Sequence, residues 1–178
     1  MKLNSVLTIL AATFIAASSY AQEAPKAANS NKLPEITIKK TDGNIFNTKD
    51  LNNSGKPMII SFWATWCKPC VAELTAIAEQ YPDWQKETGV KLVAVSIDDS
   101  RNMSKVAPFV NGRNWDYEVY VDPNSDFKRA MNVTNVPHTF LLNGNGEIVW
   151  QHTSYIPGDE AHLYENVKKL VEGKEVKN

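Results

Sequence analysis

The sequence predicts a three-layer α/β domain, and three observations support this fold class. Residues 58–63 form a nearly continuous apolar run of strand length, which is typical of a central strand covered on both faces. A helical pattern and a second apolar strand over residues 90–97 follow, so a right-handed parallel βαβ unit is the economical topology. Two strands joined by a turn over residues 139–151 and a final helix then complete the domain.

The first elements of the domain are predicted to form a hairpin. Residues 35–39 alternate as a strand does, and the turn Thr41-Asp42-Gly43-Asn44 returns the chain through Ile45 and Phe46. After the apolar strand, apolar residues recur at three- and four-residue spacing through Tyr81. This pattern predicts a helix with one buried stripe that ends or bends at Pro82.

The second half contains an insertion before its closing hairpin. Residues 101–111 look helical and residues 116–121 look extended, so a helix and a strand are added between the two halves. A short helix is expected over residues 122–131, and the final helix is expected from about Asp159 to Val171.

Length and composition fit one globular domain. The 178 residues are 43% hydrophobic and 22% charged, which excludes general disorder, a fibrous repeat and a multi-pass membrane protein. Nineteen Lys and Arg oppose 20 Asp and Glu without a long basic run, so nucleic acid is not an expected partner. The two cysteines, Cys67 and Cys70, are too few for a disulfide scaffold, and their role must be local.

The first 21 residues have the features of a signal peptide. Lys2 is the basic start, residues 6–17 are apolar, and Ser19-Tyr20-Ala21 supplies small residues for cleavage. An apolar stretch of this length reaches about 18 Å against a hydrocarbon core of roughly 30 Å, which disfavours a retained anchor. We expect residues 1–21 to be removed, residues 22–33 to be a flexible linker and residues 34–178 to fold. The mature protein would be soluble and exported, for example to a periplasm.

The two cysteines stand three positions apart where an apolar strand turns into a helix, within Trp66-Cys67-Lys68-Pro69-Cys70. At the first turn of a helix the two sulfurs can bond, and the unpaired N–H groups and the helix dipole favour a thiolate on the first cysteine. Cys67 is therefore the expected exposed nucleophile and Cys70 the resolving thiol. A zinc half-site and a purely structural disulfide are the alternatives. The first has only three histidines to complete it, and the second would close a very short loop.

The stretch over residues 59–70 resembles the active-site strand and helix start of thioredoxin-like proteins, and Val136-Pro137 before a strand resembles their cis-proline loop. The N-terminal hairpin, Glu73, the insertion, and Gly146-Glu147-Ile148-Val149 leading to Tyr155-Ile156-Pro157-Gly158 are similar to the exported TlpA and ResA-like thiol-disulfide oxidoreductases. The resemblance covers roughly residues 34–172. It implies a thioredoxin-like three-layer fold with a β-hairpin extension and an inserted helix-strand segment.

The resemblance also implies roles for three substrate-binding residues. Pro137 would be cis and lie against the cysteine pair, and Val136 would offer its backbone to an incoming peptide strand. Trp66 would form an apolar wall beside the sulfurs, with a plain core aromatic as the alternative.

Glu73 is the expected proton acceptor of the site. Helix geometry places it on the face of Cys70, one turn deeper, where burial would raise its pKa and let it accept the Cys70 proton. Thioredoxins carry a buried aspartate at the strand position that is Ser61 here, so Glu73 would take over that task. A solvated helix charge is the alternative. His138 would either tune the thiolate or be an exposed bystander.

The expected function is an exported thiol-disulfide oxidoreductase that keeps client cysteines reduced, with apocytochrome c as one candidate client. A membrane thiol-disulfide electron carrier would supply electrons, the protein would be a monomer, and no cofactor or metal is expected. A peroxiredoxin-like thiol peroxidase is one alternative, but Ala64 stands where a Thr or Ser is needed. A copper-binding chaperone is the other, although related chaperones separate their cysteines by three residues rather than two.

Overall fold

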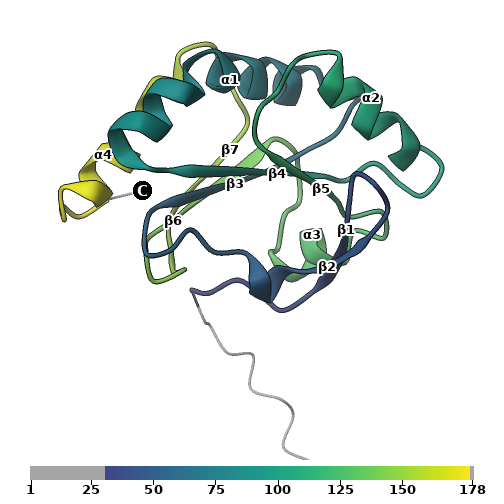
Figure 1. The fold of residues 1–178 in the computed structure, drawn as a ribbon, viewed down its shortest axis with the longest axis horizontal. Coiled ribbons are helices and arrows are strands. Elements are labelled where there is room, and N and C mark those ends of the chain that lie inside the picture. The colour runs from purple at the N-terminus through teal and green to yellow at the C-terminus, as the bar shows by residue number, and fades with distance from the viewer. Residues whose placement is uncertain (1–30, 177–178) are drawn as a thin grey trace, which may run out of the picture.

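The computed structural model describes residues 31–176, which form a seven-stranded sheet with helices on both faces (Figure 1). The predicted signal peptide and nearly all of the predicted linker lie outside the described residues. The strands are β1 (Thr37–Lys40), β2 (Ile45–Asn47), β3 (Met58–Trp63), β4 (Lys91–Ser96), β5 (Glu118–Val121), β6 (His138–Leu142) and β7 (Ile148–Thr153). The helices are α1 (Lys68–Thr88), α2 (Val106–Asn111), α3 (Asp126–Ala130), α4 (Asp159–Val171) and the 3-10 turns η1 (Thr48–Asp50) and η2 (Met103–Lys105).

The sheet confirms the predicted topology. Its strand order is β2-β1-β5-β4-β3-β6-β7, with β3, β4 and β5 parallel and the remaining neighbours antiparallel. The inserted α2 and β5 lie between the two halves, and β5 is also the strand to which the N-terminal hairpin pairs through β1. The hairpin therefore widens the sheet rather than packing on one of its faces.

Two hydrophobic cores cover the two faces of the sheet. α1, α2 and α4 lie on one face, whereas α3 lies on the other (Figure 1). All six residues of β3 are buried, and they alternate between the cores, with Ile59 and Trp63 in the first and Ile60 and Phe62 in the second. This double burial explains why the strand reads as a continuous apolar run.

Helix α1 is longer than the sequence predicts. It continues through Pro82 to Thr88 and ends at Gly89, which has a φ of 68° and donates its N–H to the carbonyl of Gln85. Of the predicted end or bend at Pro82, the end does not occur, because the segment after it buries Trp84 in the core. That burial outweighs the hydrogen bond that proline cannot make.

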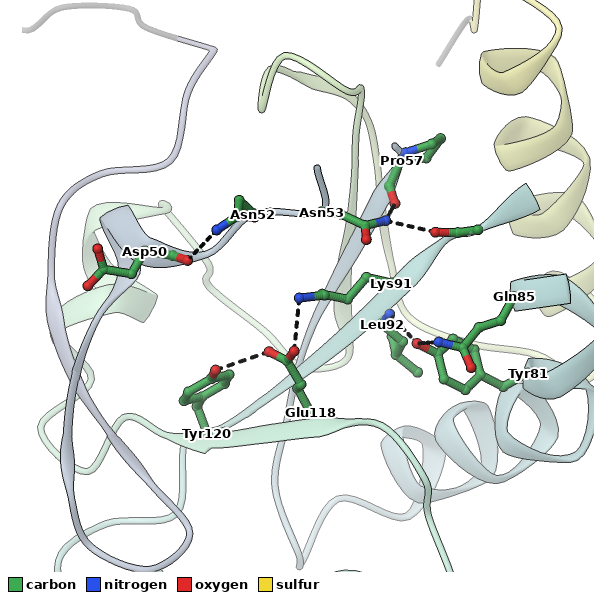
Figure 2. Close-up of polar contacts among 11 residues, drawn as sticks. Asp50, Asn52, Asn53, Pro57, Tyr81, Gln85, Lys91, Leu92, Glu118 and Tyr120 are labelled. Atoms are coloured by element: carbon green, nitrogen blue, oxygen red, sulfur yellow. Dashed lines mark hydrogen bonds and ion pairs between the residues drawn. The ribbon is translucent and has the colours of Figure 1, made fainter. Parts of the chain in front are cut away.

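Polar contacts connect the strands and α1 at the end of the sheet that lies farthest from the cysteines (Figure 2). The side-chain amide of Asn53 donates to the carbonyls of Pro57 (2.6 Å) and Gly89 (2.9 Å), which joins the start of β3 to the end of α1. Lys91 at the start of β4 forms an ion pair with Glu118 at the start of β5, at 2.9 Å. The strands are thus fixed at this end, and the cysteines follow the opposite end of β3.

The N-terminal side of the described chain already contacts the domain at residue 31. Lys32 forms an antiparallel bridge with Glu147, and the N–H of Ile148 donates to the carbonyl of Asn31. These two residues belong to the end of the predicted linker. Within residues 31–176, no helix is long and apolar enough to cross a membrane.

Candidate active site

The cysteine pair lies at the N-terminus of α1. Cys67 is the N-cap residue and Cys70 lies in the first turn; the two are joined by a disulfide with a Cα–Cα distance of 5.3 Å. The backbone N–H of Cys70 points at the Cys67 sulfur, at 3.3 Å. In the reduced protein this N–H and the positive end of the helix dipole would stabilise a thiolate on Cys67. Pro69 occupies an early position of the helix, as predicted.

The two cysteines differ in accessibility less than the sequence suggests. Cys67 is 6% exposed and Cys70 is fully buried. The prediction that Cys67 is exposed is therefore wrong, because neighbouring side chains of the core enclose most of it. Cys67 is still the more accessible of the two.

The loop before β6 lies against the cysteines. The Val136-Pro137 bond is cis, which confirms the geometry that the resemblance implies. The carbonyl oxygen of Val136 is 3.8 Å from the Cys67 sulfur, and the side chain of Val136 is half-buried. Trp66 is 64% exposed beside the pair, so it is not the core aromatic of the alternative interpretation. An exposed indole and an accessible backbone edge thus flank the sulfurs.

Glu73, three residues after Cys70 in α1, is buried rather than solvated, which excludes its alternative interpretation. Desolvation raises the pKa of its carboxyl group to about 7, although hydrogen bonds from Thr139 and Ser61 act in the opposite direction. The negative charges of Asp159 and Glu160 at the start of α4 raise it further. A carboxyl group with such a pKa can take up and release a proton near neutral pH.

Thr139 is a site residue that the sequence analysis missed. Its hydroxyl lies 2.8 Å from Glu73 Oε1 and 3.1 Å from Ser61 Oγ, while the Ser61 hydroxyl donates to Glu73 Oε2 at 3.3 Å. The antiparallel register of β3 and β6 places Ser61 opposite Thr139, which explains the contact. Strand alternation could have predicted this position, because side chains two residues apart in a strand lie on the same face of the sheet. Thr139 therefore shares a face with Leu141, which lies in the first core.

His138 is buried rather than exposed, so the interpretation of it as an exposed bystander is wrong. It is 7% exposed, stacks on Phe140 of the second core with ring centroids 4.3 Å apart, and contacts Gln151 through Nε2 at 3.0 Å. It therefore faces the side of the sheet opposite Thr139. Burial lowers the pKa of its imidazole, which favours the neutral form.

A three-layer sheet with a disulfide at a helix N-terminus, opposite a cis-proline, defines a thioredoxin-like thiol-disulfide protein. Residues 30–151 match the model of the AhpC/TSA family, and the chain belongs to that family. The chain is 32% identical over 136 residues to "Thiol-disulfide oxidoreductase ResA" of Bacillus subtilis, which covers 76% of this chain and 73% of the relative. The chain is accordingly a thiol-disulfide oxidoreductase.

Two solved structures show the same fold. An uncharacterized thioredoxin-like protein from Porphyromonas gingivalis is 52% identical, with a TM-score of 0.73 over 83% of this chain and 96% of that one. A putative thiol:disulfide interchange protein DsbE from Chlorobium tepidum is 25% identical, with a TM-score of 0.68 over 80% of this chain and 96% of that one. These similarities confirm the predicted thioredoxin-like fold.

Proposed function

We propose that the protein is an exported reductase of protein disulfides, with Cys67 as nucleophile, Cys70 as resolving thiol and Glu73 as proton acceptor. The observation that carries this proposal is the Cys67–Cys70 disulfide at the start of α1, with the buried Glu73 carboxyl three residues after Cys70 on the same helix. Val136 and Trp66 support a docking role, because a backbone carbonyl and an exposed indole lie where a client strand must approach the sulfurs. Pro137 holds the Val136 carbonyl at that position.

The reaction is a two-step exchange that moves two electrons to the client. The Cys67 thiolate attacks one sulfur of the client disulfide, a mixed disulfide forms and the other client sulfur leaves as a thiolate. Cys70 gives its proton to Glu73 and attacks Cys67, which releases the second client thiolate. The client is reduced, and the enzyme ends as the Cys67–Cys70 disulfide.

The proposal includes an electron source and a location. A reductase in an oxidising compartment must be recharged, so a membrane thiol-disulfide carrier would reduce the Cys67–Cys70 disulfide. Clients are proteins with reducible disulfides, among which apocytochrome c before haem attachment is one candidate. The protein would act as a monomer. Export follows from the signal-peptide pattern of residues 1–21, and an intact mass that begins at Gln22 after secretion in a bacterial host would test it.

Two cysteine variants and one potential test the proposed function. Cys67→Ser should abolish reduction of a disulfide-bonded peptide, whereas Cys70→Ser should accumulate the mixed disulfide, both visible by mass spectrometry. Equilibration with dithiothreitol, followed by Trp66 fluorescence, gives the reduction potential. A value of about -270 mV supports a reductase, and one of about -120 mV indicates an oxidant. Full activity of the Cys67→Ser variant would contradict the mechanism.

A further inference from the structure

Asp98, a fully buried acidic residue, lies two positions after the end of β4 and is not used by the mechanism above. One of its carboxylate oxygens, Oδ1, accepts the hydroxyl of Thr65 at 2.6 Å. The other, Oδ2, accepts the backbone N–H of Thr65 at 2.8 Å and the hydroxyl of Ser96 at 2.7 Å. The N–H of Asp98 donates in turn to Ser96 Oγ at 3.0 Å, so Ser96 also orients Asp98.

These contacts join β4 to the short loop that carries the nucleophile. Thr65 lies between the end of β3 and the start of α1, next to Trp66 and two residues before Cys67. The backbone N–H of Cys67 donates to the carbonyl of Ala64 at 3.0 Å, which makes residues 64–67 one tight turn. Any shift of Thr65 would therefore move both the sulfur and the indole.

The chemistry of the contact favours positioning over simple packing. Burying a carboxylate is costly unless donors satisfy it, and here the hydroxyl and N–H of Thr65 and the hydroxyl of Ser96 do so. A carboxylate that binds both the N–H and the hydroxyl of one residue fixes the direction of that residue as well as its distance. Such control matters here, because the Cys67 sulfur must stay 3.3 Å from the N–H of Cys70.

We propose that Asp98, buttressed by Ser96, is a positioning residue that holds Thr65 and thereby keeps the Cys67 sulfur at the N-terminus of α1. The inference rests on the proposed role of Cys67 as nucleophile. Without the contacts between Asp98 and Thr65, the Cys67 sulfur moves away from the Cys70 N–H and the helix N-terminus, so its thiolate becomes harder to form.

The test measures Cys67 reactivity in the Cys70→Ser background, where one thiol remains. Thr65→Val removes the hydroxyl that Asp98 binds without changing charge or size. We expect its alkylation by iodoacetamide at neutral pH to be slower, by up to roughly tenfold for a rise of about one unit in the thiol pKa. The pH midpoint of alkylation should move upward accordingly. Thr65→Ser, which keeps the hydroxyl, should restore the midpoint, and Ser96→Ala should shift it in the same direction by less.

A matched control separates positioning from general loss of stability. Thr48 is more deeply buried than Thr65, and its hydroxyl donates to the carbonyl of Pro34 at 2.6 Å and accepts the N–H of Ile36 at 2.7 Å, far from the cysteines. Thr48→Val should lower the free energy of unfolding but leave the alkylation midpoint unchanged. An unchanged midpoint in Thr65→Val, or an equal shift in Thr48→Val, would overturn the inference. Peptide reduction by Cys67→Ser would instead overturn the proposed function itself.

Discussion

Glu73 shows how one residue can be unfavourable for folding and useful for chemistry. Its carboxyl group is buried, and the two hydroxyl groups of Ser61 and Thr139 only partly offset the loss of water. The pKa of about 7 is therefore mainly a consequence of desolvation. In the proposed mechanism, the same property would let Glu73 accept the Cys70 proton and then release it near neutral pH.

The raised pKa of Glu73 predicts a pH dependence of stability. Because the folded-state pKa of about 7 exceeds the ordinary value of 4.5, the folded oxidised protein binds this proton more tightly than the unfolded chain. Its contribution to stability is complete below about pH 4.5 and is lost as the pH rises through 7, with a total of about 3 kcal/mol. Urea unfolding between pH 4 and pH 8 should show this decline in the natural sequence and its absence in Glu73→Gln.

The exposed Glu79 on the same helix provides the control for this prediction. Glu79→Gln makes the same chemical change without burial, so its unfolding free energy should follow the natural sequence at every pH. If Glu73→Gln and the natural sequence lost stability in parallel as the pH rose, Glu73 would not be the group that titrates.

At the scale of elements, the sequence predicts best what is set by local pattern. The apolar run of Met58–Trp63 and the helix start at the cysteines are confirmed, because burial on both faces and the capping requirements of a helix are visible in neighbouring residues. The faces of β6 were harder to predict. His138 and Thr139 are adjacent, and only the register with β3 decides which of them meets Glu73.

The end of α1 depends on tertiary burial and yields a test. Pro82 interrupts the hydrogen bonding of the helix but is exposed, so replacing it removes no core contact. Pro82→Ala should raise the free energy of unfolding by about 2 kcal/mol, since the gain in the helix exceeds the lost rigidity of the unfolded chain. Denaturant unfolding measures the change, and Asp83→Ala at the next exposed position should give a much smaller one. A less stable Pro82→Ala protein would show that proline is needed where it stands.

At the scale of the whole molecule, the contacts that stabilise the sheet and the residues of the candidate site lie at opposite ends of the strands. The N-terminal ends of β3 and β4 are tied to α1 and β5 through Asn53, Lys91 and Glu118 (Figure 2). The opposite ends carry the cysteine loop and, after β4, Asp98. The contacts at the N-terminal ends of the strands therefore do not depend on whether the two sulfurs are bonded. We expect the oxidised and the reduced protein to share one fold.

Sharing one fold links the redox reaction to stability, which gives the last prediction. Oxidation, reduction, folding and unfolding form a closed cycle. The difference in unfolding free energy between the oxidised and the reduced protein therefore equals the difference in the free energy of reducing the cysteine pair between the folded and the unfolded chain. A difference of about 30 mV in reduction potential corresponds to about 1.4 kcal/mol. Reduction creates a thiolate on Cys67, which is only 6% exposed, and the buried Glu73 carboxyl lies three residues after Cys70 in α1. We expect burial of this charge, together with a second acidic group on the same helix, to outweigh the favourable Cys70 N–H and helix N-terminus, so that the reduced protein is the less stable. Urea unfolding with and without dithiothreitol measures the difference, and a Cys67→Ser, Cys70→Ser double variant should show none. A reduced protein more stable than the oxidised one would indicate an oxidant, because conversion of its disulfide to the more stable dithiol drives the oxidation of a client.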